Sequence, residues 1–93
     1  MYQFLENVVA LEKNLMQDVI EFEGVDQDMA NMYAQDRNDV IKAKHLYNTC
    51  QVAELSKHID YLDTSIREGV VIAFAKDLGD EWVAKNLGYE VRA

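Results

Sequence analysis

The sequence predicts an all-α fold, a small bundle of three long helices with a short C-terminal helix. Apolar residues recur at steps of three and four over long stretches, which is the period of an amphipathic helix. The chain has no proline and only four glycines, so little interrupts a helix. Hydrophobic residues make up 49% of the 93 residues, which is enough for one core. We therefore expect residues 1–93 to form a single all-helical domain.

The first helix is predicted over residues 1–23. Its apolar face begins at Phe4 and ends at Phe22, while charged and amide side chains occupy the opposite side. Gly24 follows directly, and glycine readily takes the left-handed conformation found just beyond a helix. We therefore place the end of this helix at Gly24.

The second helix is predicted over residues 25–48, with Asp26 as its N-cap. Its apolar face is thinner, and the polar residues 35–39 interrupt it. Such a polar turn indicates either a solvated end or a contact with something other than the core.

The apolar pattern changes phase between residues 48 and 51. Asn48 and Gln51 have the spacing of a capping box, so we predict a short break between two helices here. The alternative is one continuous helix over residues 26–78, since no Pro or Gly forbids it.

The third helix is predicted over residues 52–78 and ends at Gly79. It carries a continuous apolar seam with heptad-like spacing, which suits either a bundle core or a helix–helix dimer. Gly69 lies on this seam inside the helix and indicates close approach of a second helix. The candidate oligomer seam comprises Val52, Leu55, Ile59, Leu62, Ile66, Gly69 and Ala73.

The fourth helix is short, over residues 81–87, and ends at Gly88. Trp82 falls in its first turn. It either anchors this helix to the core or is presented to a partner, because tryptophan is enriched at binding hot spots.

The net charge of −8 disfavours direct binding to nucleic acid or to an anionic membrane, because both need clustered Lys and Arg. The acidity serves either solubility or contact with a basic partner. The candidate interaction surface comprises Trp82 and the carboxylates Glu6, Glu12, Asp18, Glu21, Glu23, Asp26 and Asp28.

Cys50 is the single cysteine, so no intramolecular disulfide forms, which is typical of a reducing compartment. We predict that it packs in the core or in an interface as a small hydrophobe. The first ten residues lack a basic leader, and the longest apolar run, residues 70–75, is too short for a bilayer. We therefore expect a cytoplasmic protein.

No catalytic residue, cofactor site or metal site is predicted. The carboxylates of residues 21–28 do not have the ligand spacing of a calcium loop. Glu54 and His58 lie one helical turn apart, but they lack the second histidine motif of a di-iron bundle.

We expect a non-enzymatic, acidic helical protein that interacts with or regulates protein partners and also self-associates. The alternative is an inhibitor of a nucleic-acid-binding machine, of the kind phages and mobile elements make, with an acidic surface that imitates nucleic acid. A third hypothesis is a small helical protein that binds a metal or ligand through Glu54, His58 and Asp60.

Overall fold

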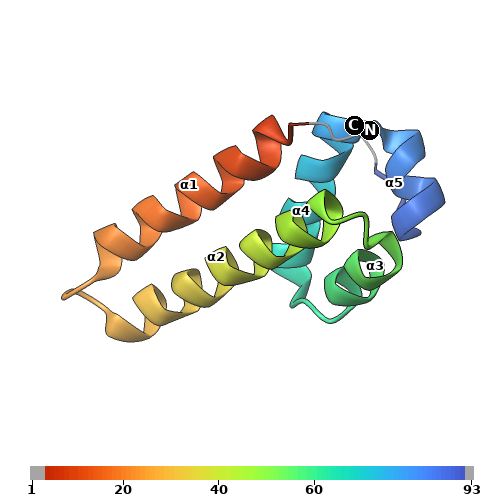
Figure 1. Ribbon diagram of the computed structural model, residues 1–93. Coiled ribbons are helices and arrows are strands. Elements are labelled where there is room, and N and C mark those ends of the chain that lie inside the picture. The colour runs from red at the N-terminus through yellow and green to blue at the C-terminus, as the bar shows by residue number, and fades with distance from the viewer. Residues whose placement is uncertain (1–3, 92–93) are drawn as a thin grey trace.

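The computed structural model describes residues 4–91 and confirms the all-α fold (Figure 1). Two long helices form an antiparallel hairpin, and three shorter helices pack against one half of it. In chain order the helices are α1 (Glu6–Phe22), α2 (Gln27–Asn48), α3 (Val52–Asp60), α4 (Thr64–Leu78) and α5 (Asp80–Leu87).

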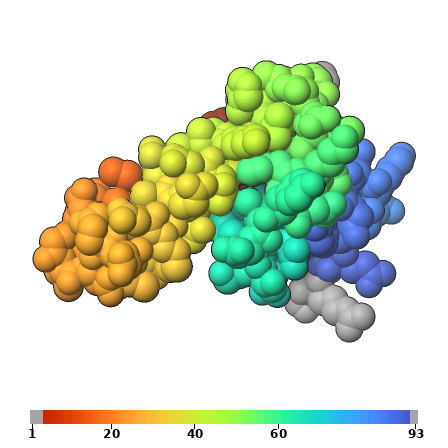
Figure 2. Space-filling view, turned by 90° about the horizontal axis from the view of Figure 1, so that it is seen from below, coloured from red at the N-terminus to blue at the C-terminus, as the bar shows by residue number. Residues whose placement is uncertain are grey.

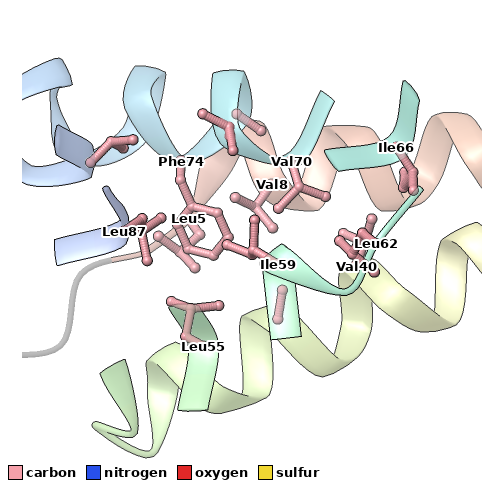
Figure 3. Close-up of a cluster of buried hydrophobic side chains, with 14 of the residues drawn as sticks. Leu5, Val8, Val40, Leu55, Ile59, Leu62, Ile66, Val70, Phe74 and Leu87 are labelled. Carbon is pink, nitrogen blue, oxygen red and sulfur yellow. The ribbon is translucent and has the colours of Figure 1, made fainter. Parts of the chain in front are cut away.

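All five helices contribute to one hydrophobic core (Figure 3). Each supplies at least one side chain with an exposed fraction of 4% or less, as shown by Val8, Val40, Leu55, Phe74 and Leu87. The charged and amide side chains of residues 4–91 stay outside this core, because no buried side chain among them is polar. The core therefore lies where α3, α4 and α5 cover the hairpin.

The prediction of one helix over residues 52–78 is wrong, because the chain turns at residues 61–63 between α3 and α4. The apolar spacing continues through this turn, from Leu55 and Ile59 to Leu62 and Ile66, so periodicity alone does not reveal it. Asp63 has an extended backbone, with ψ of 149°, at the N-cap of α4. The run Asp-Thr-Ser at residues 63–65 consists of N-cap residue types and was the available local signal.

The break after α2 is confirmed, so the alternative of one helix over residues 26–78 is wrong. The predicted capping box is also wrong, because Asn48 is the last residue of α2 and α3 has no side-chain cap. Instead, the amide of Cys50 donates to the carbonyl of Tyr47 at 3.0 Å, and that of Gln51 donates to Leu46 at 2.8 Å. This pair of bonds is the Schellman motif that ends helices.

Cys50 occupies the left-handed position of this motif, with φ of 60°, and its side chain is exposed. The prediction that it packs in the core is therefore wrong. A residue with a Cβ is strained at positive φ, and glycine is the usual occupant of this position.

We predict that Cys50→Gly raises the free energy of unfolding by about 0.5–1 kcal/mol, because glycine removes the strain but adds unfolded-state entropy. Urea unfolding measures this change. Cys50→Val should lower stability, because a β-branched residue tolerates positive φ poorly. Equal stability of the Gly and Val variants would contradict the assigned conformation.

The helix ends predicted at Gly24, Gly79 and Gly88 are confirmed, and each glycine has a positive φ. Gly79, with φ of 98° and ψ of 151°, occupies a region that is essentially restricted to glycine. This conformation joins α4 to α5 without a linker, so α5 begins one residue earlier than predicted. The predicted N-cap is also confirmed, because the side chain of Asp26 accepts from the amide of Met29 at 3.2 Å.

The start of α1 differs from the prediction, because the helix begins at Glu6; residues 1–3 lie outside the described part of the chain. Its N-cap residue, Leu5, provides no side-chain cap. The carboxylate of Asp77, in the last turn of α4, takes that role instead. It accepts from the amide of Asn7 at 2.8 Å and from that of Val8 at 3.0 Å. The side-chain amide of Asn7 donates to it as well, at 2.7 Å.

Candidate functional site: the tip of the helical hairpin

Half of the α1–α2 hairpin projects away from the bundle (Figures 1 and 2). We call residues 16–36 the hairpin tip. In α1 the last buried member of the core cluster is Leu15, and in α2 the first is Val40, so the tip lies beyond the core except for Tyr33, which packs against it. The projection gives the molecule a longest dimension of 42 Å against 24 and 23 Å in the other two directions.

The hairpin tip holds much of the negative charge of the protein. No Lys, Arg or His occurs between Lys13 and Arg37. The same segment contains six carboxylates: Asp18, Glu21, Glu23, Asp26, Asp28 and Asp36. Elsewhere acidic and basic residues are interspersed, so the structure concentrates the net charge at one end of the molecule.

Large apolar side chains are also exposed on the tip. Met16, Ile20, Val25 and Met32 have exposed fractions of 39%, 53%, 81% and 46%. They are four of the seven large hydrophobic side chains exposed in residues 4–91. Three of the four methionines of the chain lie here, including the half-buried Met29. An exposed apolar area within a charged surface is typical of an interaction site.

A stacked pair of aromatic rings packs α1 against α2 within the tip. The rings of Phe22 in α1 and Tyr33 in α2 lie 5.6 Å apart between centroids at an interplanar angle of 27°. Both side chains remain only half-buried, although Tyr33 also packs against the core. The two helices are therefore held together at their free end by a pair that is itself accessible.

Asp36 lies at the boundary between the tip and the bundle. Burial raises the pKa of its carboxyl, and the nearby carboxylates Asp39 and Asp63 raise it further. Because the folded state holds this proton more tightly, Asp36 destabilises the fold when ionised, at pH values above its raised pKa. The cost diminishes as the pH falls through that pKa.

We predict that Asp36→Asn raises the free energy of unfolding at pH 7 by about 0.5 kcal/mol, from the usual cost of like-charge pairs. The gain should shrink as the pH falls through the raised pKa, because Asp36 is then protonated in the wild type. Urea unfolding at several pH values, with the exposed Glu23→Gln as control, measures both effects. A gain that grows toward acid pH would contradict the assigned repulsion.

The predicted carboxylate surface is only partly brought together. Glu6, Glu12 and Asp18 are spaced by six residues on α1, which places them about 120° apart around the helix axis. Glu12 is bound to Lys44 of α2 at 2.7 Å, and Asp26 caps α2. The exposed end of the tip holds three of the predicted carboxylates, Glu21, Glu23 and Asp28.

Trp82 lies at the other end of the molecule and is half-buried. Its ring meets Tyr47 edge-on at 5.8 Å and stacks on Phe74 at 6.5 Å, measured between centroids. Of the two roles considered for Trp82, these contacts place it as the anchor of α5 on the core.

The candidate oligomer seam faces the inside of one chain. Leu55, Ile59, Leu62, Ile66 and Ala73 are buried in the core, and Val52 and Gly69 are half-buried. A Cβ added to Gly69 would lie 3.9 Å from Cδ2 of Leu11, so α1 packs over this position as expected of a second helix, but at an ordinary distance that also leaves room for alanine. The apolar spacing of the seam is thus satisfied without a second copy.

The residues of the metal or ligand hypothesis have separate contacts. Nε2 of His58 lies 2.9 Å from the backbone carbonyl of Asp39, which ties α3 to α2. Asp60 accepts a hydrogen bond from the hydroxyl of Tyr89, and Glu54 lies 3.6 Å from Lys57. Burial and this bond to Asp60 raise the pKa of Tyr89. No group of three possible metal ligands occurs within residues 4–91.

The sequence did not predict that Met16, Met29, Met32 and Asp36 all lie on the projecting tip. Two signals were available in the sequence: the methionines cluster within 17 positions, and basic residues are absent between Lys13 and Arg37. Neither signal tells which side chains the fold leaves uncovered.

None of the helices in the described residues combines the length and apolarity needed to cross a membrane. Comparison of the chain with protein-family models, with curated proteins and with solved structures finds no match.

Proposed function

We propose that this protein acts by binding another protein, with the hairpin tip as its contact surface. The observation that carries the proposal is the coincidence of two properties on one projecting segment. Six carboxylates without a basic residue surround apolar side chains that the core does not use. Apolar area supplies the affinity of a protein interface, and charge sets its specificity and association rate.

The chemistry of the tip favours binding over catalysis. The tip contains no Ser, Thr, Cys, His or Lys, and its carboxylates have no such side chain beside them to complete a catalytic pair. The partner that best complements this charge is basic, either because it binds nucleic acid or because it carries a basic segment. An inhibitor that imitates nucleic acid is one form of this activity.

Self-association remains a separate proposal. Because the apolar seam is inside the core, a dimer requires other exposed positions, of which Phe4, Tyr61 and Ile72 lie outside the tip. The molar mass by light scattering at low and high salt tests it. A monomer at both salt concentrations would overturn self-association and leave partner binding untouched.

The function is tested by capture of partners with two charge-matched variants. The tip variant carries Glu21→Gln, Glu23→Gln and Asp28→Asn, and the control variant carries Glu68→Gln, Glu81→Gln and Glu90→Gln; all six side chains are exposed. We expect the wild type and the control to retain the same protein and the tip variant to lose it. Equal retention by both variants would overturn the proposal. Competition by DNA or RNA for the retained protein would support the inhibitor form.

A further inference from the structure

One side of the hairpin tip continues the faces on which the bundle is built. Phe22 lies eleven residues after Leu11, and Met29 and Met32 lie eleven residues before Val40 and Ala43. Eleven residues are about three turns of an α-helix, so each pair shares one side of its helix. Leu11, Val40 and Ala43 belong to or pack against the core. We call Phe22, Met29, Met32 and Tyr33 the open face; of these four, Tyr33 also packs against the core.

The open face has the composition of a recognition surface. Met32 is 46% exposed, and the other three side chains are half-buried. Methionine adapts its shape to different apolar partners, and aromatic side chains supply much of the energy of protein interfaces. In the bundle half, helices cover the corresponding positions, so the shape of this face already suits a packed helix.

The charges beside the open face specify the partner further. Asp18 lies one turn before Phe22, Asp28 is adjacent to Met29, and Asp36 lies one turn after Met32. Asp39 and Asp63 already repel the carboxylate of Asp36, and a cation bound nearby would relieve this repulsion. A second copy of this chain would bring the same carboxylates against them, so a basic occupant is favoured over a dimer.

We propose that the open face binds a basic amphipathic helix of a partner protein, with apolar residues against Phe22, Met29 and Met32 and Lys or Arg against the flanking aspartates. This inference rests on the proposed function and names the class of partner. Such a helix presents anchors at positions i, i+3 or i+4, and i+7. Once bound, the partner helix would extend the layer of helices that covers the hairpin in the bundle as far as the end of the hairpin.

The test uses the full chain labelled with ¹³C at the methionine methyl groups and a synthetic peptide of about 18 residues. The peptide carries leucines at i, i+3, i+4 and i+7, with lysines flanking them. A matched peptide keeps the leucines and replaces every lysine by glutamate. Met16 serves as an internal control, because it lies six residues from Phe22 and hence about 120° around α1.

We expect the basic peptide to shift the methyl signals of Met29 and Met32 more than that of Met16. Its affinity should fall at least about ten-fold between about 50 and 500 mM salt, because salt screens the aspartates. Shifts centred on Met16, equal binding of the glutamate peptide, or no binding at about 50 mM salt would overturn the inference. Peptide-free Met29 and Met32 signals that change on dilution would also overturn it, since they would indicate a second copy.

A triple variant with Asp18→Asn, Asp28→Asn and Asp36→Asn tests the charges separately from the fold. We expect it to bind the basic peptide at least about ten-fold more weakly, whereas the control variant at residues 68, 81 and 90 should change affinity less than about three-fold. Equal affinity of both variants would overturn the role of the aspartates. Tip-dependent capture of a partner together with failure of the peptide would leave the proposed function standing and reject only the helical partner.

Discussion

Replacing Phe74 by alanine should lower the free energy of unfolding by about 3–5 kcal/mol, the usual cost of removing a buried aromatic ring. Phe74 is fully buried in α4 and packs against the rings of Tyr47 and Trp82, whose centroids lie 6.1 and 6.5 Å away. A domain of this size has about 5–14 kcal/mol of stability in total, so this single change should remove a large part of it.

Thermal unfolding followed by the fluorescence of Trp82 measures this effect, because Trp82 is the only tryptophan and stacks on Phe74. The midpoint should fall by more than about 12 °C. The matched control is Ile72→Ala on the same helix, where the side chain is 45% exposed and the expected loss is below about 1 kcal/mol. Similar losses for the two variants would contradict the position of Phe74 in the core.

Asp77→Ala should lower the free energy of unfolding by about 2 kcal/mol. This carboxylate accepts the amides of Asn7 and Val8 from 70 residues away in sequence, and both lie in the first turn of α1. Loss of an N-cap costs about 0.5–2 kcal/mol, and hydrogen bonds to a charged acceptor lie at or above the upper end of that range. The neighbouring Leu5 and Val8 belong to the core, so fraying of this turn also exposes apolar surface.

Urea unfolding gives the overall loss, and amide hydrogen exchange locates it. The amides of Asn7 and Val8 should exchange faster in Asp77→Ala than in the wild type, beyond what the loss of global stability explains. In Asp77→Asn these two amides should exchange at rates between those of the wild type and of Asp77→Ala, because asparagine retains one acceptor oxygen. Glu68→Ala, which removes an exposed carboxylate from the same helix, is the control and should change stability by less than about 0.5 kcal/mol.

From the sequence alone, the composition of the candidate site could be predicted, but not which of its side chains share a surface. The absence of basic residues from the tip and the cluster of methionines are visible without a structure. The carboxylates spread over several sides of α1, however, because six-residue spacing does not match the helical period. Asp36 and the aromatic pair of the open face were also out of reach, because their environment depends on where α3 and α4 end.

Local chemistry in the sequence was sufficient for the all-α class and for several helix ends. Gly24, Gly79 and Gly88 end helices through positive φ, and Asp26 caps α2, because these effects involve only neighbouring residues. Helical period likewise identified which side chains of residues 52–73 share a side.

Only the tertiary structure determines which helix packs against each apolar side. The turn at residues 61–63 keeps the apolar phase of Leu55 and Ile66, so the pattern looks the same for one helix as for two. The start of α1 depends on Asp77, and the seam is buried because α3 and α4 fold back on the hairpin. Periodicity specifies the faces of a helix, whereas the partner of each face is set by contacts between distant parts of the chain.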